Sequence, residues 1–146
     1  MEWRRDGYLI STEPELLDLD AIWGFLRTSY WAAGIPRSRI EHSLQNSLPF
    51  GLYDSGGAQA GFARAVTDHA RFAWLGDVFV LEPYRGRGLG VWLVQSVLEH
   101  PDLAEGRIVL GTADAHGLYA RFGFAAVNST HMMERPYVRP RNDSRH

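Results

Sequence analysis

Apolar residues recur along the chain with two different spacings, and these spacings separate helices from strands. Apolar residues three and four positions apart predict an amphipathic helix. Short apolar runs bounded by Gly, Pro, Asn or Asp predict strands instead. The expected helices cover residues 14–30, 37–48, 88–100 and 116–122, and the expected strands cover 8–11, 50–53, 59–66, 72–81, 108–112 and 124–127, with a further short segment at 132–135.

Turn and cap residues mark the ends of several of these elements. The run Asp54-Ser55-Gly56-Gly57 is typical of a hairpin turn. Pro101 follows the helix over 88–100, and Gly123 can take the left-handed conformation that ends a helix. Asp114 or Ala115 would precede the first turn of the helix that begins near residue 116, and Asp114 is the better candidate for its N-cap. The strand, helix and strand between residues 72 and 112 therefore form the predicted centre of the protein.

Composition narrows the class of protein. The chain has 146 residues, of which 45% are hydrophobic and 22% charged, so we expect one globular domain over residues 1–136 and a mobile tail over 137–146. A net charge of −2 disfavours general capture of nucleic acid. The chain has no Cys and its six His residues lack paired ligand spacing, so neither a Cys nucleophile nor a metal is expected. No run approaches the roughly 20 apolar residues of a membrane helix, and we expect a soluble, cytoplasmic protein.

The run Arg85-Gly86-Arg87-Gly88-Leu89-Gly90 indicates an anion site, because it lies between an expected strand and an expected helix. A helix N-terminus presents unpaired N–H groups and the positive end of its dipole, and glycines let the backbone approach phosphate oxygens closely. A dinucleotide fingerprint would need Gly at position 91, where Val91 stands, and a triphosphate loop would need Gly-Lys-Ser or Gly-Lys-Thr. The loop therefore predicts a phosphate site of another kind.

This loop resembles the cofactor motif of the GNAT superfamily of acyl-CoA N-acyltransferases, in which Arg or Gln is followed after two residues by Gly, one residue, and Gly or Ala. Arg85, Gly88 and Gly90 occupy those positions. In that family the preceding strand diverges from its neighbour and its exposed backbone binds the pantetheine arm, a form of strand addition. The resemblance assigns this backbone role to Val78 and Val80.

A second run, Leu118-Tyr119-Ala120-Arg121-Phe122-Gly123-Phe124, resembles the end of the family's short helix about thirty residues later. The spacing and order of the two motifs make the pair more specific than either alone, and the resemblance is strong over residues 66–124. The chain departs from the family at Thr112, where Asn is usual seven residues before the tyrosine. The contacts to the cofactor arm at this position are therefore open.

The resemblance implies an α/β (α+β) GNAT fold, with a central mixed, mostly antiparallel twisted sheet that is splayed in the middle and flanked by about four helices. It also implies an N-acetyltransferase that moves an acetyl group from acetyl-CoA to a small-molecule or peptide primary amine by direct attack in a ternary complex. A non-catalytic acyl-CoA sensor of the same fold is the alternative. The net charge of −2 disfavours a third alternative, a module that binds nucleic acid.

Acyl transfer from a thioester needs a neutral amine and a proton for the departing thiolate. A tyrosine, with a pKa near 10, can protonate a thiolate whose conjugate acid has a pKa near 8.5, and the resemblance gives this role of general acid to Tyr119. Asp77 is the first candidate for the base, and Asp68 or His69 is the second. The family's acceptor region would hold Phe25, Tyr30 and Trp31, which suit an apolar or cationic amine and could equally line a homodimer interface. The expected cofactor-binding residues are Val78, Val80, Arg85, Gly86, Arg87, Gly88, Leu89, Gly90, Thr112 and His116.

Overall fold

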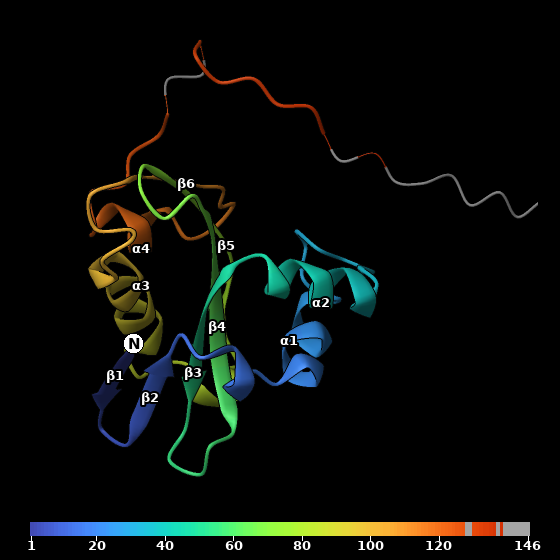
Figure 1. The fold of residues 1–146 in the computed structure, drawn as a ribbon, viewed down its shortest axis with the longest axis vertical. Coiled ribbons are helices and arrows are strands. Elements are labelled where there is room, and N and C mark those ends of the chain that lie inside the picture. Colours follow the sequence, from blue (N-terminus) through green and yellow to red (C-terminus); the bar gives the residue numbers. More distant parts are fainter. Residues whose placement is uncertain (128–129, 137, 139–146) are drawn as a thin grey trace, which may run out of the picture. The chain divides into compact units, whose positions relative to one another are not determined.

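A computed structural model describes residues 1–127, 130–136 and 138, which group into two compact units, Met1–Asp114 and Ala115–His146. The first unit is built on a six-stranded sheet in which the strands follow chain order (Figure 1). Each strand is antiparallel to the one before it, except that β6 is parallel to β5. The strands are β1 (Glu2–Arg5), β2 (Tyr8–Ser11), β3 (Leu48–Tyr53), β4 (Gln59–Thr67), β5 (Phe72–Val80) and β6 (Arg107–Leu110).

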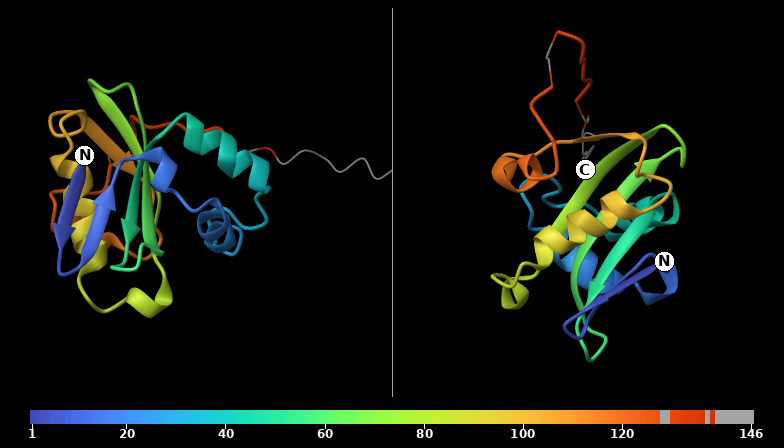
Figure 2. Two further views of the ribbon diagram at one scale, coloured as in Figure 1. Left: turned by 60° about the horizontal axis from the view of Figure 1, so that its bottom comes forward. Right: turned by 90° about the vertical axis from the view of Figure 1, so that its left-hand side faces the viewer.

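Three helices cover this sheet within the first unit. Helices α1 (Leu19–Leu26) and α2 (Arg37–Gln45) lie on one face, and α3 (Leu89–Glu99) lies on the other (Figures 1 and 2). Short 3-10 turns, η1 (Pro14–Leu16) and η2 (Glu82–Tyr84), precede α1 and α3. The second unit contains α4 (His116–Ala120). None of the helices in the described part of the chain is long and apolar enough to cross a membrane.

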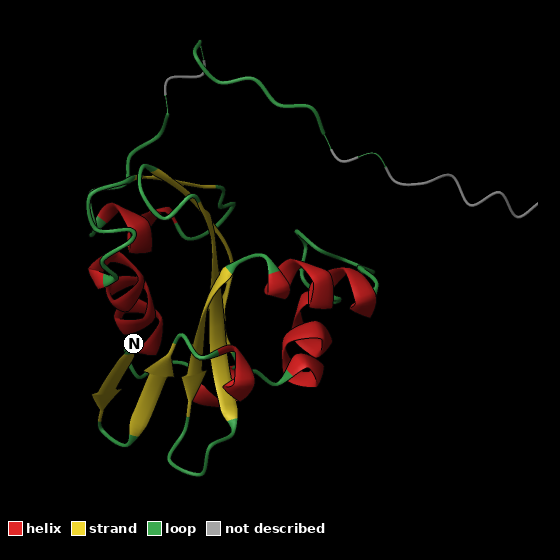
Figure 3. Ribbon diagram, in the orientation of Figure 1, coloured by secondary structure: helices red, strands yellow, loops and turns green. Residues whose placement is uncertain are grey.

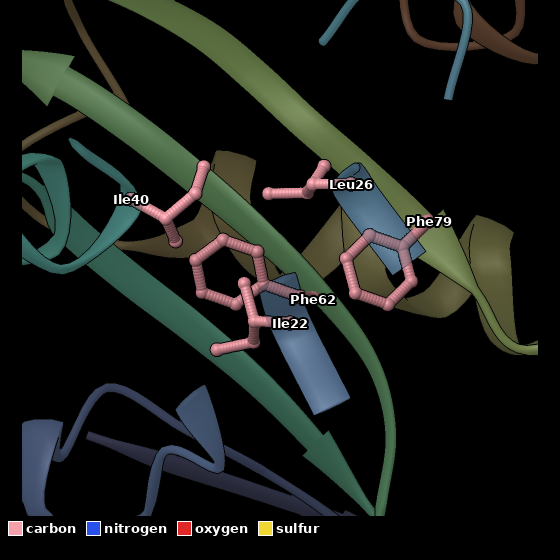
Figure 4. Close-up of a cluster of buried hydrophobic side chains, with 5 residues drawn as sticks. All are labelled: Ile22, Leu26, Ile40, Phe62 and Phe79. Atoms are coloured by element: carbon pink, nitrogen blue, oxygen red, sulfur yellow. The ribbon is translucent and has the colours of Figure 1, made fainter. Parts of the chain in front are cut away.

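A cluster of buried side chains fastens α1 and α2 to the sheet (Figure 4). Ile22 and Leu26 come from α1, Ile40 from α2, Phe62 from β4 and Phe79 from β5, and none exposes more than 5% of its surface. The four-residue spacing of Ile22 and Leu26 places both on one side of their helix. Because Phe79 belongs to the cluster, the last residues of β5 are held firmly on this face.

The sheet opens between β5 and β6. Their paired residues run from Phe72↔Arg107 to Leu75↔Leu110, whereas β5 stays paired with β4 as far as Gly61↔Val80. Within the described residues, the part of β5 after Leu75 is therefore paired on its β4 side alone. A bulge between Phe62 and Arg64 in the β4 register adds to this divergence. The predicted splayed, mostly antiparallel sheet is confirmed.

Several predicted boundaries are wrong. The helix expected over 14–30 is divided into η1 and α1, because Asp18 accepts a hydrogen bond from the N–H of Ala21 and caps a new helix there. Helix α1 ends at Leu26, and α2 ends at Gln45 rather than 48, since Leu48 already pairs with Ala65 in the sheet. The apolar spacing that predicted longer helices continues through irregular turns.

The strands expected at 124–127 and 132–135 do not form, and both segments are loop in the described structure (Figure 3). Alanine at 125 and 126 and charged residues at 134 and 135 have a low preference for strands. The pattern within a segment also does not show whether a neighbouring strand is available to pair with it. The N-cap of α4 is Ala115 and makes no side-chain cap bond, so the prediction of Asp114 as the cap is also wrong. Apart from Val138, the expected tail over 137–146 lies outside the described residues.

Candidate active site

The loop between η2 and α3 carries two glycines in the left-handed region. Gly86 has φ 79° and Gly88, the N-cap residue of α3, has φ 76°. The N–H of Trp92 bonds to the carbonyl of Gly88 and closes the first helical turn. The backbone N–H groups of residues 89–91 therefore lack carbonyl partners one turn earlier in the helix, which leaves them suited to an anion.

The two loop arginines are exposed, and the guanidinium group of each makes one hydrogen bond within the protein. Arg85 Nε donates to the carbonyl of Val80 at 2.9 Å, and Arg87 donates to the hydroxyl of Tyr8 at 2.9 Å. These bonds hold both guanidinium groups beside the loop while leaving further N–H donors on each group. The first bond also shows that the Val80 carbonyl already has one donor.

A third arginine at this site was not among the predicted residues. Arg5 approaches the carbonyl of Gly88 to 3.4 Å, and its guanidinium lies 4.9 Å from the ring centroid of Trp92. It reaches the loop because β1 and β2 form a hairpin through Asp6 and Gly7, both with positive φ. An Asp-Gly pair is a strong hairpin signal, and it could have predicted β1 despite its polar sequence.

Among the described residues, the strand that leads into this loop has one unpaired edge after Leu75. Val78 and Val80 are half-buried residues of β5, in the part that has left β6. Gly90 comes close to this strand, because a Cβ built on it would lie 3.9 Å from a methyl carbon of Val80. The structure thus brings the predicted strand residues and the predicted loop together. Leu89 contributes differently, since its side chain is 4% exposed and packs in the core.

Asp77 lies at the bulge of β5 with φ 53°, a conformation that Asp tolerates better than most residues. Its carboxylate forms an ion pair with Arg64, whose Nε lies 2.8 Å from Oδ2, and both side chains are largely buried. Trp31 Nε1 donates to the other oxygen, Oδ1, at 3.0 Å. Arg64 also donates to the hydroxyl of Ser47. A carboxylate with two donors is fixed in place and still has acceptor capacity.

Aromatic rings continue from the core to this carboxylate. Phe25 stacks on Phe79 with ring centroids 4.2 Å apart and lies 6.1 Å from the ring of Trp31, which in turn meets Tyr30 edge-to-face at 4.9 Å. The hydroxyl of Tyr30 accepts a hydrogen bond from the N–H of Ala113, just beyond β6. Of the predicted acceptor residues, Trp31 therefore contacts Asp77, and the rings of Phe25 and Tyr30 both contact Trp31.

Asp68 and His69, the second pair of base candidates, lie elsewhere. They occupy the turn between β4 and β5, at the opposite end of β5 from the glycine loop. Asp68 accepts three backbone N–H bonds within this turn, which lower the pKa of its carboxyl to about 2. His69 Nδ1 lies 2.7 Å from a carboxylate oxygen of Asp102. These contacts give Asp68 and His69 structural roles in the turn.

Thr112 and the residues of α4 complete the predicted set. Thr112 is half-buried and follows β6 in the first unit. In the second unit Tyr119 is 8% exposed, and its ring meets Phe124 edge-to-face at 5.8 Å. His116 is exposed one turn before Tyr119, and Gly123 follows the helix with φ 87°. Among the described residues, no group of three or more His, Asp or Glu could hold a metal ion.

The sheet, the glycine loop and the helix order agree with a known family. A sequence model of the acetyltransferase (GNAT) family matches residues 13–124. The chain belongs to the GNAT family of acetyltransferases. A Gibberella zeae protein that is assigned by name to the acetyltransferases is 32% identical over 142 residues, which cover 82% of this chain and 79% of that protein.

Solved structures of acetyltransferases show the same architecture. A crystal structure from Xanthomonas campestris pv. campestris, assigned to the GNAT family, is 44% identical with a TM-score of 0.85 and covers 90% of this chain and 93% of its own. Glucosamine-6-phosphate N-acetyltransferase from Arabidopsis thaliana is 14% identical with a TM-score of 0.63, covering 89% and 97% of the two chains. This second likeness concerns the fold alone. The protein is therefore an acetyltransferase with the GNAT fold.

Proposed function

We propose that this GNAT acetyltransferase transfers an acetyl group from acetyl-CoA to the nitrogen of a primary amine. The observation that carries the proposal is the continuity of the site: the unpaired half of β5, with Val78 and Val80, leads through η2 into a loop with left-handed Gly86 and Gly88. A strand edge suits the amides of a pantetheine arm, and a helix N-terminus suits a pyrophosphate. The two features together fit one ligand with both parts.

Arginine side chains add positive charge where the pyrophosphate would lie. The guanidinium groups of Arg5, Arg85 and Arg87 contact the loop, the last residue of β5 and a neighbouring tyrosine, respectively. Charge-assisted hydrogen bonds to phosphate are about twice as strong as neutral ones. The local charge therefore favours an anionic donor despite the net charge of −2 of the whole chain.

The reaction forms an N–C bond and breaks the C–S bond of the thioester. The amine, with a pKa near 10.4 when free, must lose a proton before it attacks, and the departing thiolate must gain one. Asp77 is the proposed acceptor of the first proton, either directly or through water, and Tyr119 is the proposed donor of the second. The acyl group moves directly between the two substrates, so no covalent enzyme intermediate is formed.

Calorimetric titration with CoA tests the loop. Gly88→Ala forces a Cβ into the left-handed region and should weaken CoA binding at least tenfold. Gly57→Ala is the matched control, because Gly57 has φ 86° in the β3–β4 turn and an equal backbone cost without a role in the loop. Equal CoA affinity in the two variants would contradict the assignment of the loop.

Thiol release from acetyl-CoA, measured across a library of primary amines, tests the chemistry. Tyr119→Phe should lower kcat by about 100-fold, a typical contribution of a general acid. The control is Tyr53→Phe, which removes a tyrosine hydroxyl on β3 and should leave kcat unchanged. Amine-dependent release that does not respond to Tyr119→Phe would remove the acid assignment. CoA binding without transfer to any amine would favour the sensor alternative.

A single domain over residues 1–136 and a homodimer remain predictions. The family match from residue 13 to residue 124 supports the first, because it extends across both compact units. Sedimentation of the full chain would decide the second.

A further inference from the structure

Three exposed aromatic residues lie where β5 and β6 part, and we call Tyr30, Trp31 and Trp74 the aromatic frame. They are 62%, 42% and 41% exposed respectively. Large aromatic side chains with this much exposed surface, gathered in one place, are a common mark of a binding surface. Trp74 was not among the residues that the sequence singled out.

Trp74 lies across the point where the two strands separate. A Cβ built on Gly76 would lie 3.1 Å from Trp74 Nε1, and one built on Gly111 would lie 3.5 Å from Trp74 Cη2. Gly76 and Gly111 are the first residues after the last β5–β6 pair, Leu75↔Leu110. The indole therefore rests on two glycines, one on each side of the opening.

The other two rings are tied to the same two segments. Trp31 donates its indole N–H to Asp77, one residue after Gly76, and Tyr30 accepts the N–H of Ala113, two residues after Gly111. These hydrogen bonds use atoms at the ring edges, Nε1 and Oη. All three residues of the aromatic frame thus border the opening between β5 and β6, beside the part of β5 that is proposed to bind acetyl-CoA.

The carboxylate in contact with the aromatic frame has a cation as its partner. Asp77 is the carboxylate in contact with Trp31, and it is already paired with Arg64. An acceptor with several ammonium groups would meet a neutralised carboxylate, whereas a single amine could use the remaining acceptor capacity of Asp77. An aromatic ring on the acceptor could pack against the frame at the usual centroid distances of about 4.5–7 Å.

We propose that the acceptor is an arylalkylamine, a primary amine joined to an aromatic ring by a short alkyl chain. This inference rests on the proposed function and names the class of its acceptor. The ring packs against Tyr30, Trp31 and Trp74, and the amine reaches the opening beside Asp77. Its nitrogen loses a proton and forms the N–C bond while the C–S bond of acetyl-CoA breaks.

The test compares kcat/KM for 2-phenylethylamine, 2-cyclohexylethylamine and spermidine, with thiol release from acetyl-CoA as the readout. The cyclohexyl compound has the same carbon skeleton without the π system. We expect 2-phenylethylamine to be preferred about tenfold over 2-cyclohexylethylamine and more strongly over spermidine. Transfer to the three amines at similar rates, or a preference for spermidine, would overturn the acceptor class and leave the proposed function standing. No transfer to any amine would overturn both.

Variants locate the ring. Trp74→Leu should raise the KM for 2-phenylethylamine at least fivefold and leave the KM for acetyl-CoA unchanged, whereas Trp74→Phe, which keeps a ring, should stay within twofold of the wild type. Trp3→Leu is the control, because Trp3 lies on β1, at the opposite edge of the sheet from β6, and donates to Glu99 of α3. A dimer that dissociates in Trp74→Leu with no change in the amine KM would show that the residue serves an interface and would overturn the proposal.

Discussion

The ion pair between Arg64 and Asp77 allows a quantitative test of how the site is held. The side chains are 19% and 10% exposed, so the pair is neither fully buried nor a surface pair. Removing one partner of a fully buried pair costs about 3–5 kcal/mol, and exposed pairs contribute about 0–1 kcal/mol. We therefore expect Asp77→Asn or Arg64→Met to lower the free energy of unfolding by about 2 kcal/mol.

Asn is the right replacement at position 77 for two reasons. It tolerates the positive φ of 53° and keeps an oxygen that can accept a hydrogen bond, so the change removes mainly the negative charge. In Arg64→Met the carboxylate of Asp77 is left without its cation. The double variant removes both charges and leaves neither one stranded, so it should cost only about 1–1.5 kcal/mol, less than either single change.

Urea unfolding, followed by tryptophan fluorescence, measures these quantities. With a slope of about 2 kcal/mol per M, a loss of about 2 kcal/mol moves the midpoint down by about 1 M. Arg37→Met is the matched control, because Arg37 pairs with Asp20 at the surface, where the side chains are 48% and 76% exposed. If Arg64→Met shifts the midpoint no more than Arg37→Met does, and the single changes simply add, the pair does not hold the bulge in place.

Three further predictions concern other parts of the protein. Burial raises the pKa of Tyr53 to about 12 and its hydroxyl has no partner among the described residues, so Tyr53→Phe should raise the free energy of unfolding by about 1 kcal/mol in the same urea assay. Burial lowers the pKa of His100, so the unfolded state binds a proton more tightly than the folded state does. The free energy of unfolding should therefore fall as the pH drops below about 6.5. The difference in melting temperature between pH 7.5 and pH 5 should be smaller in His100→Asn than in the wild type. Arg5→Gln should weaken CoA binding about fivefold by calorimetry, whereas Arg4→Gln, next to it in β1, should have no effect; equal effects would place Arg5 outside the site.

Local chemistry made the centre of the protein predictable. The glycines of the loop can adopt positive φ without steric cost, and α3 follows them with a continuous apolar face. The hairpin at Asp54 is equally local, because one carboxylate oxygen of that residue accepts the N–H groups of Gly56 and Ala58. Such features need no distant residue, and here the expected and observed structures agree.

Features that depend on distant partners were harder to predict. Arg5 reaches the loop across 83 positions of sequence, and Trp74 becomes part of a site because two glycines from different strands make room for its indole. No pattern in a single segment contains that information. The strand expected at 124–127 fails for the same reason, since alternation within a segment does not provide an edge to pair with.

Asp77 shows why a residue can be identified before its role is understood. The sequence suggested Asp77 as a base because it lies next to Val78, in the part of the strand expected to bind the cofactor. In the structure Asp77 has three structural roles: it adopts a left-handed conformation at the bulge, forms an ion pair with Arg64 and accepts a hydrogen bond from Trp31. These tasks are compatible with proton transfer, because a base must be fixed in position before it can act. The two roles separate experimentally. If Asp77 serves structure alone, the urea midpoint and kcat of Asp77→Asn should recover together when Arg64→Met is added, because the stranded charge is gone. If Asp77 is also the base, stability should recover in the double variant while kcat stays low, and the rise of kcat/KM with pH should move toward the pKa of the free amine.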